Sequence, residues 1–204
     1  MRLFRLVALL IVFVLTNSAP AGAQDADLVS IETPRGVKQA FILIEPEAPV
    51  ASVILFAGGH GALGLKDASS MEWGERSFLV RSREKFAAHK LIVAVVDAPS
   101  DREDGMDSTF RMGNAHAGDI GAVAAYLKEL ADVPVWLVGT STGTWSAAWG
   151  AIAADHIDGL VLTSTITRTR PHWKLAQTHS DGVASLPLEE IGRASCRERV
   201  LDHV

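Results

Sequence analysis

The residues best suited to chemistry lie in one short segment near the middle of the chain. The segment has the pattern Gly-x-Ser-x-Gly and consists of Gly139, Thr140, Ser141, Thr142 and Gly143. An apolar run at 133–138 precedes it and an alanine-rich stretch at 144–154 follows it, so it lies between a predicted strand and a predicted helix. In that context the pattern predicts a nucleophile elbow, a turn that lifts one serine hydroxyl clear of a sheet. Ser141 is therefore the candidate nucleophile.

The neighbours of Ser141 suit such a turn. Its backbone is strained, and Gly139 and Gly143 have no Cβ that would clash. The amide of Thr142 is expected at a helix N-terminus, where it can bind an oxyanion. The alternative is a tight turn with a structural serine.

A glycine-rich loop after an earlier apolar run is the second candidate element. Residues 51–56 are continuously apolar or small, as expected for a strand buried on both faces, and Gly58-Gly59-His60-Gly61 follow closely. Loops that follow parallel strands meet at the carboxyl edge of the sheet, so this loop is expected beside Ser141. Gly59 or His60 is predicted to supply a second oxyanion amide. Alternatively, His60 only packs against the loop or orients it.

The same loop matches a dinucleotide-binding pattern, Gly59-x-Gly61-x-x-Gly64, by letter only. No acidic residue ends a strand about twenty residues later, and no regular helix opens at Gly64. No His, Cys or Asp cluster has metal-ligand spacing either. We therefore expect no cofactor and no metal.

Polar residues after the apolar run at 91–96 could reach the same rim. Asp97 and Asp101 could contact a substrate there, although turn-forming aspartates are common at such positions and that role is favoured. His116, just before a predicted helix at 117–130, could also approach the rim. A capping or surface role is favoured for it.

Strand-like and helix-like segments alternate along the chain, which predicts one α/β domain with a mostly parallel sheet and helices on both faces. The predicted strands lie at 28–32, 39–45, 51–56, 91–96, 133–138 and 159–163, and the predicted helices at 78–88, 117–130 and 144–154.

Composition supports a single globular domain and excludes some partners. The chain has 204 residues, of which 48% are hydrophobic and 21% charged, and a formal net charge of −5. No basic run or stripe is present, so a nucleic-acid partner is not expected.

The first 23 residues have the features of a secretory signal. Arg2 and Arg5 precede an apolar run at 6–15, which is too short to span a bilayer. The small residues at 21–23 fit a cleavage site, which gives a mature start at Gln24. We expect a protein exported to the periplasm or secreted, without a stable membrane anchor; the alternative is an uncleaved anchor.

The last residues differ from the rest of the chain. Residues 191–200 read Ile-Gly-Arg-Ala-Ser-Cys-Arg-Glu-Arg-Val and include the only cysteine, Cys196. This run resembles the in-frame translation of a common DNA-sequencing adapter. We expect residues 24–190 to be part of a natural domain and residues 191–204 to be a non-native tail. The alternative is an ordinary arginine-rich helix end.

The glycine loop, the strand end at 95–101 and the segment around Ser141 together resemble exported bacterial α/β-hydrolases, over about 28–190. The resemblance implies a serine hydrolase that attacks a small ester, or an amide or thioester, through an acyl-enzyme on Ser141 without a cofactor. It assigns oxyanion amides to Thr142 and Gly59. It also implies a triad in the chain order Ser, Asp or Glu, His.

The chain departs from that family after Ser141. One predicted strand, 159–163, follows, and no carboxylate comes directly after it. The last two strands of the fold and the acid and base of the triad thus have no match. We expect this chain to be inactive and, because the strand at 159–163 becomes a sheet edge, poorly soluble.

Two other interpretations stay open. A binding or scaffold protein can have the same fold without catalysis, and it would not react with a fluorophosphonate. A hydrolase could instead use an internal histidine, His60 or His116, as an unusual base. The predicted lid at 165–188 shows no readable pocket.

Overall fold

The computed structural model describes residues 25–166. The predicted signal sequence, most of the predicted lid and the adapter-like tail lie outside the described residues.

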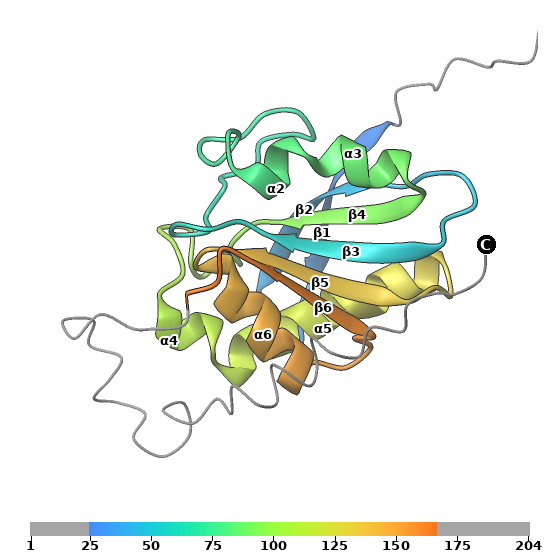
Figure 1. The fold of residues 1–204 in the computed structure, drawn as a ribbon. Helices are drawn as coiled ribbons and strands as arrows, with labels where there is room; N and C mark the ends of the chain where they lie inside the picture. Colours follow the sequence, from blue (N-terminus) through green and yellow to red (C-terminus); the bar gives the residue numbers. More distant parts are fainter. Residues whose placement is uncertain (1–24, 167–204) are drawn as a thin grey trace, which may run out of the picture.

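Within this range, six strands form one mixed sheet in the order β1-β2-β4-β3-β5-β6 (Figure 1). Strands β4, β3, β5 and β6 run parallel, whereas β1 and β2 are antiparallel to their neighbours. The predicted parallel arrangement is thus confirmed, with an antiparallel pair of strands at one edge. The strands are β1 (Ala26–Glu32), β2 (Lys38–Ile44), β3 (Ala51–Phe56), β4 (Leu91–Val96), β5 (Val135–Thr140) and β6 (Gly159–Thr163).

Helices cover both faces of the sheet (Figure 1). The helices are α2 (Phe78–Arg81), α3 (Arg83–Ala88), α4 (Ser108–Arg111), α5 (Asn114–Leu130) and α6 (Gly143–Ala153). Alternate residues of each central strand face opposite helix layers, because successive side chains of a strand point to opposite faces. In β3, Val53 packs in the cluster that contains Leu79 of α2, and Ile54 packs in the cluster that contains Val123 of α5. The apolar run at 51–56 is therefore a strand buried on both faces, as predicted.

The helices differ in detail from the prediction. The helix predicted at 78–88 is interrupted at Ser82, whose amide donates to the Leu79 carbonyl in a tight turn. The helix predicted at 117–130 begins three residues earlier, at Asn114. Helix α4 lies in a segment for which no helix was predicted; its N-cap Asp107 accepts a hydrogen bond from the Phe110 amide at 2.8 Å. A helix of four residues is too short to show a helical period, so the pattern could not reveal it.

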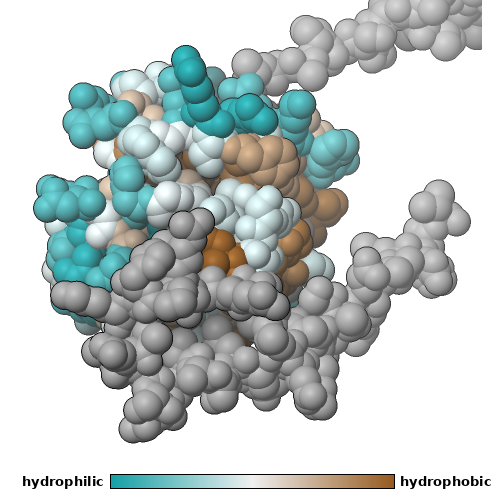
Figure 2. All heavy atoms as spheres, turned by 60° about the vertical axis from the view of Figure 1, so that its left-hand side comes forward, coloured by the Kyte–Doolittle hydropathy of each residue, from teal (hydrophilic) through white to brown (hydrophobic). Residues whose placement is uncertain are grey.

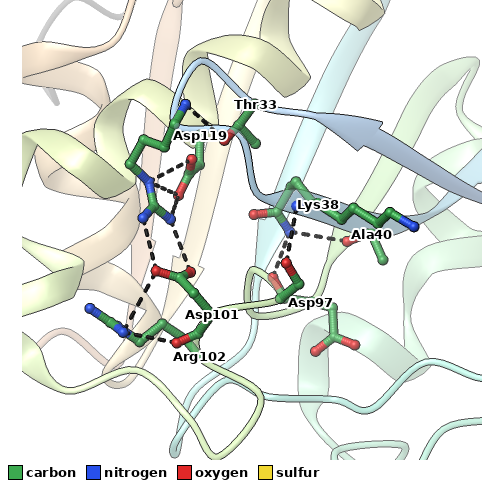
Figure 3. A network of polar contacts seen from close by, with 10 residues as sticks. Thr33, Lys38, Ala40, Asp97, Asp101, Arg102 and Asp119 are labelled. Carbon is green, nitrogen blue, oxygen red and sulfur yellow. Dashed lines mark hydrogen bonds and ion pairs between the residues drawn. The ribbon is translucent and has the colours of Figure 1, made fainter.

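A polar network ties the β1–β2 turn to α5 and to the loop after β4 (Figure 3). The Arg35 guanidinium lies 2.7 Å from the fully buried Asp119 carboxylate and 2.9 Å from Asp101. The hydrogen bonds that Arg35 donates to Asp101 and, with a smaller effect, to Asp119 raise the pKa of Arg35. Asp101, which the sequence placed near the rim, is held in this network.

Candidate active site

Ser141 lies in the turn between β5 and α6, at the carboxyl edge of the parallel strands. Its φ is +53°, in the left-handed region that costs free energy for a residue with a side chain. The Ser141 amide donates to the Thr163 carbonyl at 3.2 Å, and the Ser141 carbonyl accepts from the Thr144 amide at 3.1 Å. These bonds hold the strained turn between β6 and the first turn of α6.

Both glycines that flank this turn are required by close backbone contacts. A Cβ at Gly139 would lie 2.5 Å from the Gly143 carbonyl oxygen, and a Cβ at Gly143 would lie 2.3 Å from the Phe56 carbonyl oxygen. Any side chain at either position would collide with backbone. The turn between β5 and α6 is therefore tightly packed on both sides of Ser141.

The glycine loop after β3 packs directly against this turn. A Cβ on Gly58 would lie 3.0 Å from the Ser141 Cβ. Gly59 has φ +62°, and the Trp73 ring occupies the space where its Cβ would lie. The Gly59 carbonyl accepts a hydrogen bond from the Thr142 hydroxyl at 2.7 Å. The loop and the turn are thus joined through Gly59 and Thr142.

The amides of Gly59 and Thr142 are the predicted oxyanion donors, and neither donates to any residue in 25–166. Thr142 immediately precedes α6, so its amide also lies at the positive end of that helix. Both amides are free to donate to an oxygen of a bound molecule.

An open cleft of about 550 Å³ lies beside Ser141. Gly58, Gly59 and Ser141 line one part of it, and the segment at 71–78 forms the facing wall. The large apolar side chains Trp73 and Phe78 of this wall are 40% and 51% exposed. Figure 2 shows the molecule with the carboxyl edge of the sheet turned forward. Hydrophilic residues lie mainly on the left of this view, and apolar residues gather on the right. The sequence did not predict this wall, because residues 71–78 show no periodic pattern that places them near Ser141.

Asp97 follows β4, as predicted, but its carboxylate is occupied by backbone amides. It accepts hydrogen bonds from Leu63 at 2.6 Å, Leu65 at 2.8 Å and Ala98 at 2.7 Å. Asp97 lines a separate hollow of about 370 Å³ and not the cleft beside Ser141. Its observed contacts hold the chain that follows the glycine loop, which is the turn-forming alternative.

His116 does not lie on the rim, where one interpretation placed it, nor on the surface. It is 2% exposed, and its ring packs between Phe56 and Phe110 with centroid distances of 6.2 and 5.2 Å. The early start of α5 places His116 within the first helical turn, on the side that faces the sheet. Neither ring nitrogen has a hydrogen-bond partner among the described residues. Burial, together with the charges of Arg111 and Arg35, lowers the pKa of His116 to about 3, so the ring is neutral.

His60 is exposed and contacts the glycine loop and the cleft wall. Its ring lies 4.2 Å from the Trp73 ring between centroids, and its Nδ1 accepts from the Ala62 amide at 3.2 Å. No hydrogen bond reaches the Ser141 hydroxyl from any residue between 25 and 166. Within this part of the chain, no candidate general base is hydrogen-bonded to the Ser141 hydroxyl.

Arg111 was not anticipated from the sequence. It ends the short helix α4, is 1% exposed, and donates to the Gly59 carbonyl at 3.3 Å and to the Ser146 hydroxyl at 2.8 Å. Burial lowers the pKa of Arg111 to about 10, so it stays charged at neutral pH. An arginine in a polar stretch usually lies at the surface, and nothing in the local pattern marks this one as buried.

Residues 25–166 contain no group of three or more His, Cys, Asp or Glu side chains that could hold a metal ion. No helix in this range is long and apolar enough to span a bilayer.

Solved structures similar to this chain include esterases and a serine hydrolase. An esterase of Pyrococcus furiosus is 19% identical with a TM-score of 0.52, over 74% of this chain and 53% of its own. A cold-adapted esterase from an Arctic intertidal metagenomic library is 14% identical with a TM-score of 0.51, over 72% of this chain and 63% of its own. An α/β serine hydrolase without a lid from Xanthomonas campestris is 14% identical with a TM-score of 0.50, over 71% and 63%.

These similarities show that the chain has the α/β-hydrolase fold, as the sequence resemblance implied. The chain spans less than two thirds of the length of each of these structures. No protein-family model matches it, and no curated protein matches it.

Proposed function

We propose that this chain is the nucleophile-bearing part of a serine hydrolase that acts on an ester, or on an amide or thioester. The observation that carries the proposal is the position of Ser141. It lies in a left-handed turn between β5 and α6 and lines a cleft. The amides of Gly59 and Thr142, in the loop and turn that pack together here, have no hydrogen-bond acceptor within residues 25–166. This combination suits attack on a carbonyl group, because the hydroxyl and the oxyanion donors meet at one edge of the sheet.

In the proposed reaction, the Ser141 oxygen attacks the carbonyl carbon of the substrate and its proton passes to a general base. The tetrahedral oxyanion accepts hydrogen bonds from the amides of Gly59 and Thr142. The base returns the proton to the leaving oxygen, nitrogen or sulfur, and the carbon–heteroatom bond breaks to leave an acyl-enzyme. Water then attacks the acyl group and regenerates the free serine. No cofactor takes part.

In this proposal, the general base and its acid partner lie outside residues 25–166, in a part of the parent protein that follows Glu190. Residues 191–204 are then a non-native tail. Two observations support a base outside these residues. The His60 ring packs on Trp73 and accepts a hydrogen bond from the Ala62 amide, and His116 is buried between aromatic rings. A serine hydroxyl is a weak nucleophile at its own pKa, so a chain without the base keeps only residual activity.

The exposed aromatic residues of the cleft wall suit a small substrate with an apolar acyl or alcohol group. Trp73 and Phe78 face the same cleft as Ser141, and aromatic rings gain much from covering apolar surface. We also propose that the parent protein is exported after removal of residues 1–23.

The test begins by sequencing the source DNA across codon 190. The longer protein and the 204-residue chain are then assayed with p-nitrophenyl esters, each beside its Ser141→Ala variant. Ser30→Ala, an exposed serine on β1 outside the cleft, is the matched control. We expect turnover by the longer protein that Ser141→Ala abolishes and Ser30→Ala leaves intact, and at most residual turnover by the 204-residue chain. Robust turnover by the 204-residue chain would overturn the assignment of the base to missing residues.

The second candidate is a non-catalytic binding or scaffold protein with the same fold. The lack of a base hydrogen-bonded to the Ser141 hydroxyl within residues 25–166 is the observation that favours it. A reading frame that ends at Val204, together with no fluorophosphonate reaction at Ser141, would make this candidate the leading one.

A further inference from the structure

Arg111 is a buried cation that the proposed reaction does not use. Its side chain is among the largest that are fully buried, and no ion pair links it to a carboxylate within the part of the chain that the structure describes. Buried charges in proteins are usually paired, because taking a charge out of water is costly. The role of this guanidinium therefore depends on the neutral groups that it contacts.

The guanidinium connects three segments beneath the candidate site. It donates to the Met106 carbonyl at 3.4 Å before α4, to the Ser146 hydroxyl at 2.8 Å in α6, and to the Gly59 carbonyl at 3.3 Å in the glycine loop. A Cβ at Gly61 would lie only 2.2 Å from the Arg111 terminal nitrogen, so the loop lies directly on the guanidinium. Arg111 thus supports the glycine loop from the core side.

Gly59 is the residue of the loop on which these contacts converge. Its carbonyl accepts from both Arg111 and the Thr142 hydroxyl, and the Trp73 ring occupies the space where its Cβ would lie. With φ at +62° and no side chain, Gly59 would otherwise be among the most mobile residues of the loop. Anchoring its carbonyl fixes the peptide plane between Gly59 and His60. Through the Gly59 Cα it also limits how far the Gly59 amide, one of the two proposed oxyanion donors, can turn.

We infer that Arg111 is a positioning residue for the oxyanion site of the proposed hydrolase. Its guanidinium holds the Gly59 carbonyl so that the Gly59 amide keeps its place beside the Thr142 amide and Ser141. Its positive charge, buried beneath the loop, also favours the negative charge that develops on the substrate oxygen. This inference rests on the proposed function of Ser141.

A purely structural role for Arg111 predicts a different outcome. If Arg111 only fills space and bonds the core, its removal lowers stability without changing the reactivity of Ser141 in the folded protein. Lysine keeps the charge, but it lacks the planar fork that reaches Ser146 and Gly59 together. Methionine removes both charge and hydrogen bonds.

The experiment measures how fast a fluorophosphonate modifies Ser141 in the 204-residue chain at pH 9, by intact mass. The serine oxygen bonds to phosphorus, the phosphorus–fluorine bond breaks and fluoride leaves, and hydroxide in solution takes the proton in place of the missing base. Saturation with probe separates the maximal rate from the probe concentration at half-saturation. Thermal melting at pH 7 identifies the variants that fold.

The expected result is a lower maximal rate with unchanged half-saturation. Arg111→Met should reduce the maximal rate about 10²-fold, the size of losing one oxyanion donor, and Arg111→Lys should reduce it about 10-fold. Ser146→Ala, which removes one bond to the guanidinium and is expected to fold even if Arg111→Met does not, should reduce it a few-fold. Hydrogen exchange in the peptide that contains Gly59 should speed up in the same order.

Thr142→Val provides a coupling test, because the Thr142 hydroxyl and Arg111 hold the same carbonyl oxygen. The losses from Thr142→Val and Arg111→Lys should not simply multiply in the double variant. Wild-type maximal rates in folded Arg111→Lys and Ser146→Ala would overturn the inference. If the longer protein, read past codon 190, forms no fluorophosphonate adduct at Ser141 at neutral pH, the proposed function is overturned and the inference falls with it.

Discussion

Ser141 adopts a backbone conformation that a serine in an ordinary turn avoids, and its two flanking glycines make that conformation possible. The strain is held by bonds to Thr163 and Thr144, at the ends of two separate elements. Strained residues persist where the surrounding structure over-determines them, and such residues gather at functional sites. At the residue scale, the turn is therefore the feature that most favours catalysis over a structural serine.

Gly143 offers a direct test of this packing. In Gly143→Ala the new methyl group would lie 2.3 Å from the Phe56 carbonyl oxygen, so we expect a loss of about 1–3 kcal/mol in the free energy of unfolding. Gly118→Ala in α5 is the matched control, because nothing lies within 4 Å of its Cβ position, and it should be neutral or slightly stabilising. Urea denaturation measures both. Equal stability of the two variants would contradict the described turn.

His116 predicts a specific dependence of stability on pH. Its pKa is lowered to about 3 in the folded protein, whereas the unfolded chain has the ordinary value near 6.5. The unfolded state therefore binds more protons as the pH falls below 6.5, and stability is lost in that window. His116→Leu removes this contribution.

Between pH 7 and pH 5, His116→Leu should lose about 2 kcal/mol less stability than the wild type. Urea denaturation at the two pH values measures the difference directly. Identical losses in both proteins would show that His116 is not buried in its neutral form.

At the scale of elements, the Arg35 network predicts which ion pairs matter for stability. Arg35→Met would leave the fully buried Asp119 carboxylate without its cation, and we expect a loss of about 3 kcal/mol. Lys66→Met breaks the exposed pair with Glu72 and should cost under about 0.5 kcal/mol. Denaturant titration of the two variants compares them, and a loss as small for Arg35 as for Lys66 would count against a buried pair.

The elements that could be predicted are those whose pattern is local. Strands β3, β4 and β6 begin and end at the predicted residues, since each is an apolar run bounded by polar or turn-forming residues. Helix α5 begins three residues before its predicted start. The pattern did not reveal this first turn because the turn lacks apolar residues at helical spacing. With that shift of three residues, His116 lies in the core, and not in the favoured capping or surface position or on the rim.

The parts of the site that could not be predicted depend on long-range contacts. The pattern around Ser141 and the glycine loop is local, and both were found. Trp73 lies fourteen residues beyond Gly59, and Arg111 is fifty-two residues beyond it, with no motif linking them. The burial of Arg111 follows from the packing of α4 against α6, which no local pattern expresses.

At the scale of the whole molecule, β6 pairs with β5 along one side, and no other described strand covers its opposite side. Val161 in β6 is 41% exposed. Open strand edges pair with other chains, so we expect the 204-residue chain to self-associate at raised concentration. Val161→Lys should shift size-exclusion elution toward the monomer, while Val50→Lys, also exposed but outside the strands, should not. A wild-type chain that elutes as a monomer at every concentration would contradict this expectation.

The central claim is that Ser141 is the nucleophile of a hydrolase, and one measurement tests it most directly. The protein encoded by the source DNA read past codon 190 is treated with a fluorophosphonate and digested, and the modified residue is located by tandem mass spectrometry. The account predicts a single adduct on the Ser141 hydroxyl, formed rapidly at neutral pH. An adduct on another residue, or none, would contradict it.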